Sequence, residues 1–90
     1  MNKIELEILL TLKLNGFNYI ARDKDEKFLT AFMIYPIKND DEWLTEKLAE
    51  PAFQLNENRF KFIKYSEQTP REINSLISQN IKQIEEKKDE

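Results

Sequence analysis

The sequence predicts an α+β fold in which helices pack on a small antiparallel sheet. Two apolar runs, at residues 17–22 and 27–37, are separated by a polar turn, as in a strand hairpin. Residues 70–86 carry apolar side chains three and four apart, which is typical of an amphipathic helix. The expected strands lie near 17–22, 27–37 and 59–65, and the expected helices near 3–14, 40–49 and 70–86.

The composition excludes several classes of chemistry. The chain has 90 residues with no Cys, no His and one Gly. Disulfides, thiolate catalysis, His bases and Gly-rich phosphate loops are therefore excluded. Since 90 residues support one core, we expect a single domain over residues 1–90. We also expect no enzymatic activity, cofactor or metal.

Charge and hydropathy limit the classes of partner and the cellular location that we expect for the protein. The net charge of −3 at pH 7 is too small for a general nucleic-acid coat, which is usually strongly basic. No stretch approaches the roughly 18 apolar residues of a membrane span. Acidic residues interrupt the apolar positions near the N-terminus, unlike a signal peptide. We therefore expect a cytoplasmic protein without membrane contact.

Residues 3–14 carry two conflicting signals. Apolar residues at every second position from Ile4 to Leu14 favour a strand, and Asn15 with Gly16 would form its hairpin turn. However, Glu, Leu and Lys favour a helix, and Gly16 could end it in a left-handed conformation. The residues alone leave both structures open.

The three strand predictions rest on apolar or aromatic runs. Residues 23–26 form the polar turn of the first hairpin. The run 27–37 is apolar on both faces, which predicts a central strand, and Pro36 should mark the end of its pairing. Residues 59–65 alternate cationic with apolar or aromatic side chains. We expect residues 52–58 to form a loop that could include a short extended piece.

The two later helices are predicted from cap signals. Asn39 or Asp40 would cap the helix at 40–49, which Pro51 would stop. Thr69 would cap the last helix, with Pro70 first and Glu72 third in a capping box. Residues 85–90 are all charged and are expected to fray.

Two surfaces are candidate binding sites. The basic and aromatic strand at 59–65 could stack bases and hold phosphates; its alternative is a half-buried strand with Phe60 and Phe62 in the core. The nucleic-acid contacts would be Arg59, Lys61, Lys64 and Arg71. The stripe of the last helix could pair with a second copy or simply cover the sheet. The stripe consists of Ile73, Leu76, Ile77, Asn80, Ile81 and Ile84.

Two acidic clusters are weaker candidates. Asp23, Asp25 and Glu26 form one, and residues 40–42 form the other. Carboxylates can hold Mg²⁺ or Ca²⁺, but the first cluster lacks the Gly and the third ligand of a calcium loop. We interpret the clusters as a solvated turn and a helix N-terminus.

Residues 15–25, NGFNYIARDKD, resemble a group of small phage and prophage proteins of Gram-positive bacteria. That group carries a run of the form G-[YF]-x-Y-I-A-R-D-x-D followed by Gly, where this chain has Glu26. Residues 67–77 are similar to its closing segment. The resemblance implies a helix at 3–14, and no residue role transfers, because no activity is assigned to the group.

The resemblance implies a phage or prophage accessory protein that acts by protein–protein interaction. Its partner would be a host or phage protein, and a homodimer through the last helix is a further expectation. The alternative hypothesis is a small nucleic-acid-binding module that uses the strand at 59–65; the acidic net charge argues against it.

Overall fold

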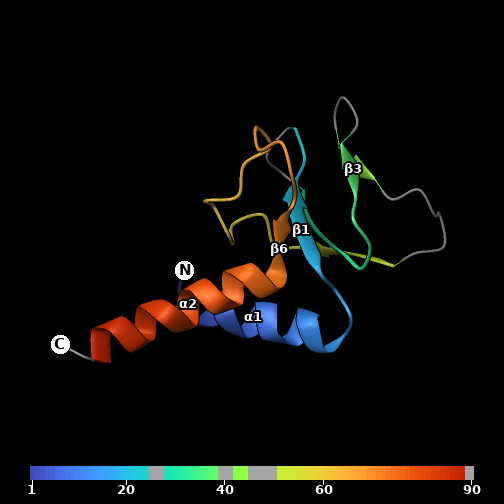
Figure 1. Cartoon of the computed structure of the whole chain (residues 1–90). Coiled ribbons are helices and arrows are strands. Elements are labelled where there is room, and N and C mark those ends of the chain that lie inside the picture. Colours follow the sequence, from blue (N-terminus) through green and yellow to red (C-terminus); the bar gives the residue numbers. More distant parts are fainter. Residues whose placement is uncertain (25–27, 39–41, 45–50, 89–90) are drawn as a thin grey trace.

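The computed structural model describes residues 1–24, 28–38, 42–44 and 51–88, except for the side chains of residues 83–88. Two helices accompany a four-strand antiparallel sheet and a separate two-strand hairpin (Figure 1). The predicted α+β class is confirmed. The elements differ from the sequence predictions in several places, described below.

Helix α1 spans Lys3–Leu14, so the helix that the resemblance implied at 3–14 is confirmed. The Asn2 side chain accepts a hydrogen bond from the Glu5 amide at 2.9 Å, and the Glu5 carboxylate accepts one from the Asn2 amide at 3.3 Å. This capping box and Gly16, at φ +90°, bound the helix. Asn15 and Gly16 therefore end a helix, and the hairpin turn considered there is wrong.

The sheet has the strand order β5-β2-β1-β6. Strands β1 (Tyr19–Arg22) and β2 (Leu29–Phe32) form the predicted hairpin, with Tyr19 opposite Phe32. Strand β5 (Ala52–Leu55) pairs with the other side of β2, so β2 is central as predicted. Strand β2 ends at Phe32, four residues before Pro36. The extended piece considered within residues 52–58 is an edge strand.

The helix predicted at 40–49 is wrong where the structure describes it. Trp43–Leu44 form strand β4, which pairs with β3 (Ile37–Lys38), and residues 40–41 and 45–49 lie outside the described residues. The Trp43 ring is buried against the sheet, and its Nε1–H donates to the Arg22 carbonyl at 3.1 Å. Tertiary burial of this large side chain therefore outweighs the local cap signals.

The strand predicted at 59–65 is also wrong, because this segment forms turns. Phe60 has a left-handed backbone with φ +53° and is fully buried, as is Ile63 three residues later. The buried Arg22 guanidinium donates to backbone carbonyls of this segment. These carbonyls are therefore satisfied by a side chain, in place of a neighbouring strand.

Helix α2 (Ile73–Lys88) begins three residues after the predicted start. The capping box at Thr69, Pro70 and Glu72 is wrong, since Arg71–Glu72 form strand β6 and pair with β1. The Ile73 amide donates to the Asn18 carbonyl at 2.9 Å. Pairing with β1 thus uses the backbone that would have formed the first turn.

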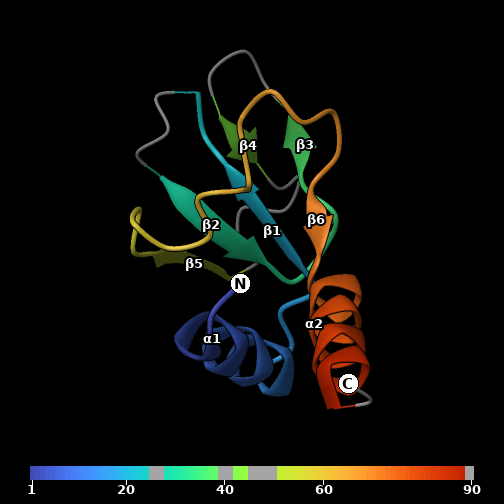
Figure 2. The ribbon, with the colours of Figure 1, turned by 90° about the vertical axis from the view of Figure 1, so that its left-hand side faces the viewer.

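Both helices lie side by side at one side of the sheet, and the β3–β4 hairpin lies apart from them (Figure 2). The main core is built from the two helices, the sheet and the segment at 60–63. Its buried members are Leu9, Leu12, Phe17, Ile20, Leu29, Ala31, Phe60, Ile63, Ile73 and Leu76. A second cluster on the other face joins Ala21, Phe32 and Trp43. Within the described ranges, no helix is long and apolar enough to cross a membrane.

Candidate binding groove

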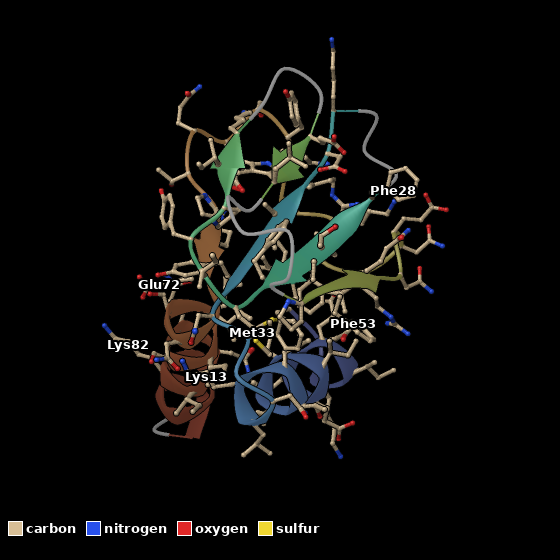
Figure 3. The ribbon with its side chains drawn as sticks, turned by 90° about the vertical axis from the view of Figure 1, so that its right-hand side faces the viewer. Lys13, Phe28, Met33, Phe53, Glu72 and Lys82 are labelled. Carbon is tan, nitrogen blue, oxygen red and sulfur yellow. The ribbon has the colours of Figure 1, made fainter. Side chains whose placement is uncertain are left out.

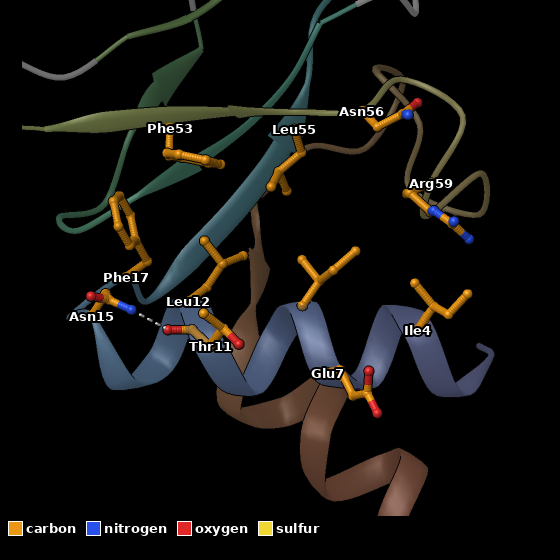
Figure 4. A pocket seen from close by; sticks show the side chains of 11 residues that line it. Ile4, Glu7, Thr11, Leu12, Asn15, Phe17, Phe53, Leu55, Asn56 and Arg59 are labelled. Carbon is orange, nitrogen blue, oxygen red and sulfur yellow. Dashed lines mark hydrogen bonds between the residues drawn. The ribbon is translucent and has the colours of Figure 1, made fainter.

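An open groove with a volume of about 580 Å³ lies between α1 and the edge strand β5 (Figures 3 and 4). Ligand pockets commonly have volumes of roughly 300–1,000 Å³. The apolar lining consists of Ile4, Ile8, Leu12, Phe17, Phe53 and Leu55. The polar lining consists of Glu7, Thr11, Asn15, Asn56 and Arg59. The groove is therefore apolar along its length, with polar groups at its rim.

The groove follows from the sheet register. Leu55 stands opposite Leu29, and Phe53 stands opposite Ala31, so both β5 side chains lie on the core face of the sheet. Strand β5 is at the edge of the sheet, and α1 lies opposite it across the groove (Figure 4). Phe53 consequently lies between β5 and α1 and remains 54% exposed (Figure 3).

The apolar side chains of the α1 wall differ in burial. Leu12 is buried and belongs both to the core and to the groove lining, whereas Ile4 is 50% exposed and Ile8 is half-buried. The Phe17 ring closes one end of the groove and meets the Phe53 ring edge-on at 6.3 Å between centroids. The opposite end, beside Ile4, is open toward the turn that follows β5 (Figure 4).

Arg59 stands at this open end. The Arg59 amide donates to the Asn56 carbonyl at 3.1 Å, which closes the turn after β5 and returns the chain toward α1. Among the residues that the structure describes, none forms a hydrogen bond or an ion pair with the Arg59 guanidinium. A half-buried cation without a partner at the end of an apolar groove suits a carboxylate ligand.

Buried groups hold the turn segment in place. Arg22 is 1% exposed and donates to the carbonyls of Ile63 at 2.7 Å, Arg59 at 2.8 Å, and Phe60 and Glu57 at 3.1 Å. From α1, the buried Glu5 carboxylate accepts a hydrogen bond from the Phe60 amide. The backbone that carries Arg59 is therefore fixed from β1 and from α1, so this end of the groove is preorganised.

The residues predicted to contact nucleic acid do not share a strand face. Arg59 reaches the groove, while Lys61 and Lys64 are exposed on the turns. Arg71 Nε lies 2.8 Å from the Glu67 carboxylate, and its guanidinium lies 5.6 Å from the centroid of the Phe62 ring. The flat aromatic and basic surface that the nucleic-acid hypothesis requires is absent from the described segment 59–65.

The stripe predicted for self-association is divided along α2. Ile73, Leu76 and Asn80 are buried, and Ile77 packs against the core. The first half of the stripe is thus buried in the core of this chain, where α2 packs against α1. Ile81 is 46% exposed, and the side chain of Ile84 lies outside the described part.

The acidic clusters are described only in part. Asp23 accepts a hydrogen bond from the Trp43 amide at 3.1 Å, and Glu42 is exposed. Asp25, Glu26 and residues 40–41 lie outside the described residues. Within the ranges that the structure covers, no three acidic residues converge as a metal site would require.

The apolar groove was not predicted from the sequence. Ile4 and Phe53, which line it, are far apart in the chain, and only the sheet register brings them together. A partial signal is present at residues 52–55, where Phe53 and Leu55 alternate with smaller or polar residues. Comparison with known proteins found no match to a family model, to a curated protein or to a solved structure.

Proposed function

We propose that the protein acts by binding another protein and that the groove between α1 and β5 is its binding surface. The half-exposed Phe53 on β5 and Ile4 on α1, which lie toward opposite ends of the groove in Figure 4, carry this proposal. Clustered apolar side chains of this kind, rimmed by polar groups, mark interaction sites on folded proteins. A bound partner would cover them.

The chemistry of the groove supports binding over catalysis. Glu7 and Arg59 are the charged residues of its lining, and no ion pair joins them within the described chain. Acid–base catalysis needs a positioned group that exchanges protons near neutral pH, most often His, and the sequence has none. The residues of the groove are suited to shape complementarity and to one charge-assisted contact.

The kind of partner follows from the resemblance of residues 15–25 and 67–77 to phage and prophage proteins. On that basis we propose a phage or prophage accessory protein that acts in the cytoplasm of the host cell. Its partner is then a host or phage protein.

A capture experiment tests this function. The tagged protein is incubated with a lysate of a Gram-positive host, with and without nuclease, and retained proteins are identified by mass spectrometry. A second bait carries Phe53→Asp, which places a charge in the groove. The matched control carries Leu14→Asp, because Leu14 is 88% exposed on α1 and lies outside the groove.

We expect a stoichiometric protein partner that resists nuclease, is lost with Phe53→Asp and is retained with Leu14→Asp. Circular dichroism must show that both variants are folded. A partner that Phe53→Asp retains would contradict the groove as the binding surface. If nuclease treatment removes the retained proteins, the result would instead support nucleic-acid binding through the cations Arg59, Lys61, Lys64 and Arg71.

A further inference from the structure

We infer that the groove receives an extended peptide segment of the partner, which adds to the sheet as a strand beside β5 and places a carboxylate at Arg59. This inference rests on the proposed function, since it names how the same groove binds a protein. Three features of the described structure support it: the free edge of β5, the apolar face beside that edge and the unpaired Arg59.

The outer edge of β5 presents unpaired backbone groups. Within the described residues, β5 pairs only with β2 and ends the sheet. The Phe28 carbonyl accepts a hydrogen bond from the Asp23 amide, and the Phe32 carbonyl accepts one from the Asn18 amide, both on the side of β1. Because alternate residues of a strand bond to opposite neighbours, Leu29 and Ala31 direct their N–H and C=O groups toward β5. Leu55 and Phe53 stand opposite them, and the N–H and C=O of Gln54 therefore point away from the sheet.

Such an edge is a template for an added strand. Alternate side chains of that strand would lie on the same face as Phe53 and Leu55, about 4.8 Å farther from β2. Figure 4 shows the groove with β5 above it and α1, including Ile4, below it. Two apolar side chains separated by one residue would fill the space.

The positive charge of Arg59 at the open end of the groove further restricts which peptide sequences can bind. Arg59 faces the open end and has no side-chain partner among the described residues, and Glu7 points away from β5 in Figure 4. A carboxylate there would form a charge-assisted hydrogen bond. All strand pairs of this sheet are antiparallel, and β5 runs toward Arg59. In a peptide strand that pairs antiparallel with β5, the acidic residue that contacts Arg59 therefore precedes the two apolar residues in the peptide sequence.

A second copy of the chain is the alternative occupant of this edge. Strand β5 itself carries no carboxylate, and the acidic residues nearest to it in the sequence are Glu50 and Glu57. Self-association is therefore an outcome that the experiment must recognise, and sedimentation of the protein alone measures it.

The test uses the purified full chain and fluorescein-labelled ten-residue peptides, with binding read by fluorescence anisotropy. The parent peptide has one Glu followed by alternating Thr and Leu, and a second peptide has Gln in place of Glu. Two further peptides carry backbone N-methyl groups, one at the Leu positions and the other at the Thr positions. N-methylation removes donors from one edge of a strand without changing its side chains.

We expect saturable binding of the parent peptide and about tenfold weaker binding of the Gln peptide, as one charge-assisted contact implies. One N-methylated peptide should lose at least about tenfold in affinity and the other less than about twofold, because only one strand edge faces β5. Arg59→Glu should abolish the preference for Glu over Gln. Lys61→Glu changes the charge equally from an exposed turn position outside the groove and should preserve that preference.

Absence of saturable binding by every peptide would overturn the inference, as would equal loss with both N-methylation patterns. A dimer in sedimentation that Gln54→Pro dissociates would show that a second copy occupies the edge, and would overturn it too. In each case the capture experiment with Phe53→Asp still decides independently whether the groove binds a protein.

Discussion

Replacing Arg22 by Met should remove a large part of the stability of this protein. Arg22 is 1% exposed, and its guanidinium donates to four backbone carbonyls between residues 57 and 63. Met fills similar space without donors. Each hydrogen bond from a charged group contributes about 1.5–3 kcal/mol, and each buried acceptor left without a donor costs about 1–3 kcal/mol.

The net loss is smaller than the sum of these terms, because removal of a buried charge also removes its desolvation cost. Carbonyls of the turn that regain water offset more of the loss. We therefore expect Arg22→Met to lower the free energy of unfolding by about 3–5 kcal/mol, on the order of 1 kcal/mol for each of the four carbonyls left without its donor. A chain of 90 residues has a total of roughly 5–13 kcal/mol.

Urea unfolding measures this change, and the single Trp of the chain provides the fluorescence signal. Trp43 Nε1–H donates to the carbonyl of Arg22, so the probe reports on the same region. Arg59→Met is the matched control, because the Arg59 side chain has no described partner, and its effect should stay within about 0.5 kcal/mol. Arg22→Lys keeps the charge with fewer donors and should fall between the two.

A loss below about 1 kcal/mol for Arg22→Met, or a loss equal to that of Arg59→Met, would refute the reasoning. Either result would mean that water satisfies the carbonyls of the turn segment as well as Arg22 does. The slope of the free energy against urea concentration should be the same in all variants, since a changed slope would indicate a different unfolding transition.

Three further predictions concern the ends of α1 and the hairpin. Gly16→Ala should cost about 1–2 kcal/mol by urea unfolding, because φ +90° is unfavourable for a residue with a Cβ; an unchanged midpoint would contradict this origin of the helix end. Asn2→Ala removes the acceptor for the Glu5 amide and should cost about 1 kcal/mol, which thermal unfolding by circular dichroism checks; equal stability would show that the cap is formed by water. Trp43→Phe removes the donor to the Arg22 carbonyl and should lower the free energy of unfolding by about 1–3 kcal/mol. A loss below about 0.5 kcal/mol would show that this hydrogen bond does not contribute to stability.

Local patterns were sufficient for the hairpin of β1 and β2 and for the amphipathic stripe of α2. In both, the apolar period matches the burial observed: β2 is the central strand, and Ile73 and Leu76 face the core. Helix α1 was ambiguous from the residues alone, since its apolar residues also alternate. Its caps at Asn2 and Gly16 resolve the ambiguity, together with the burial of Leu9 and Leu12.

The segment at 59–65 shows why alternation alone can mislead. Its cationic and aromatic residues have the period of a strand, yet Phe60 and Ile63 are buried three residues apart on turns. One reason is Arg22, which lies 41 residues before Ile63 and donates hydrogen bonds to three carbonyls of the segment, those of Arg59, Phe60 and Ile63. A donor from so distant a part of the chain leaves no local pattern to recognise.

The sequence by itself determined the α+β class, the hairpin, the apolar face of α2 and the exclusion of His and Cys chemistry, because these depend on composition and on short-range periodicity. Only the tertiary structure decided the groove. It requires Phe53 at a sheet edge and Ile4 on a helix 49 residues earlier, and the pairing of β5 with β2 brings them to one surface. Exposure of an apolar side chain is a property of its neighbours in space, and those neighbours are distant in the sequence.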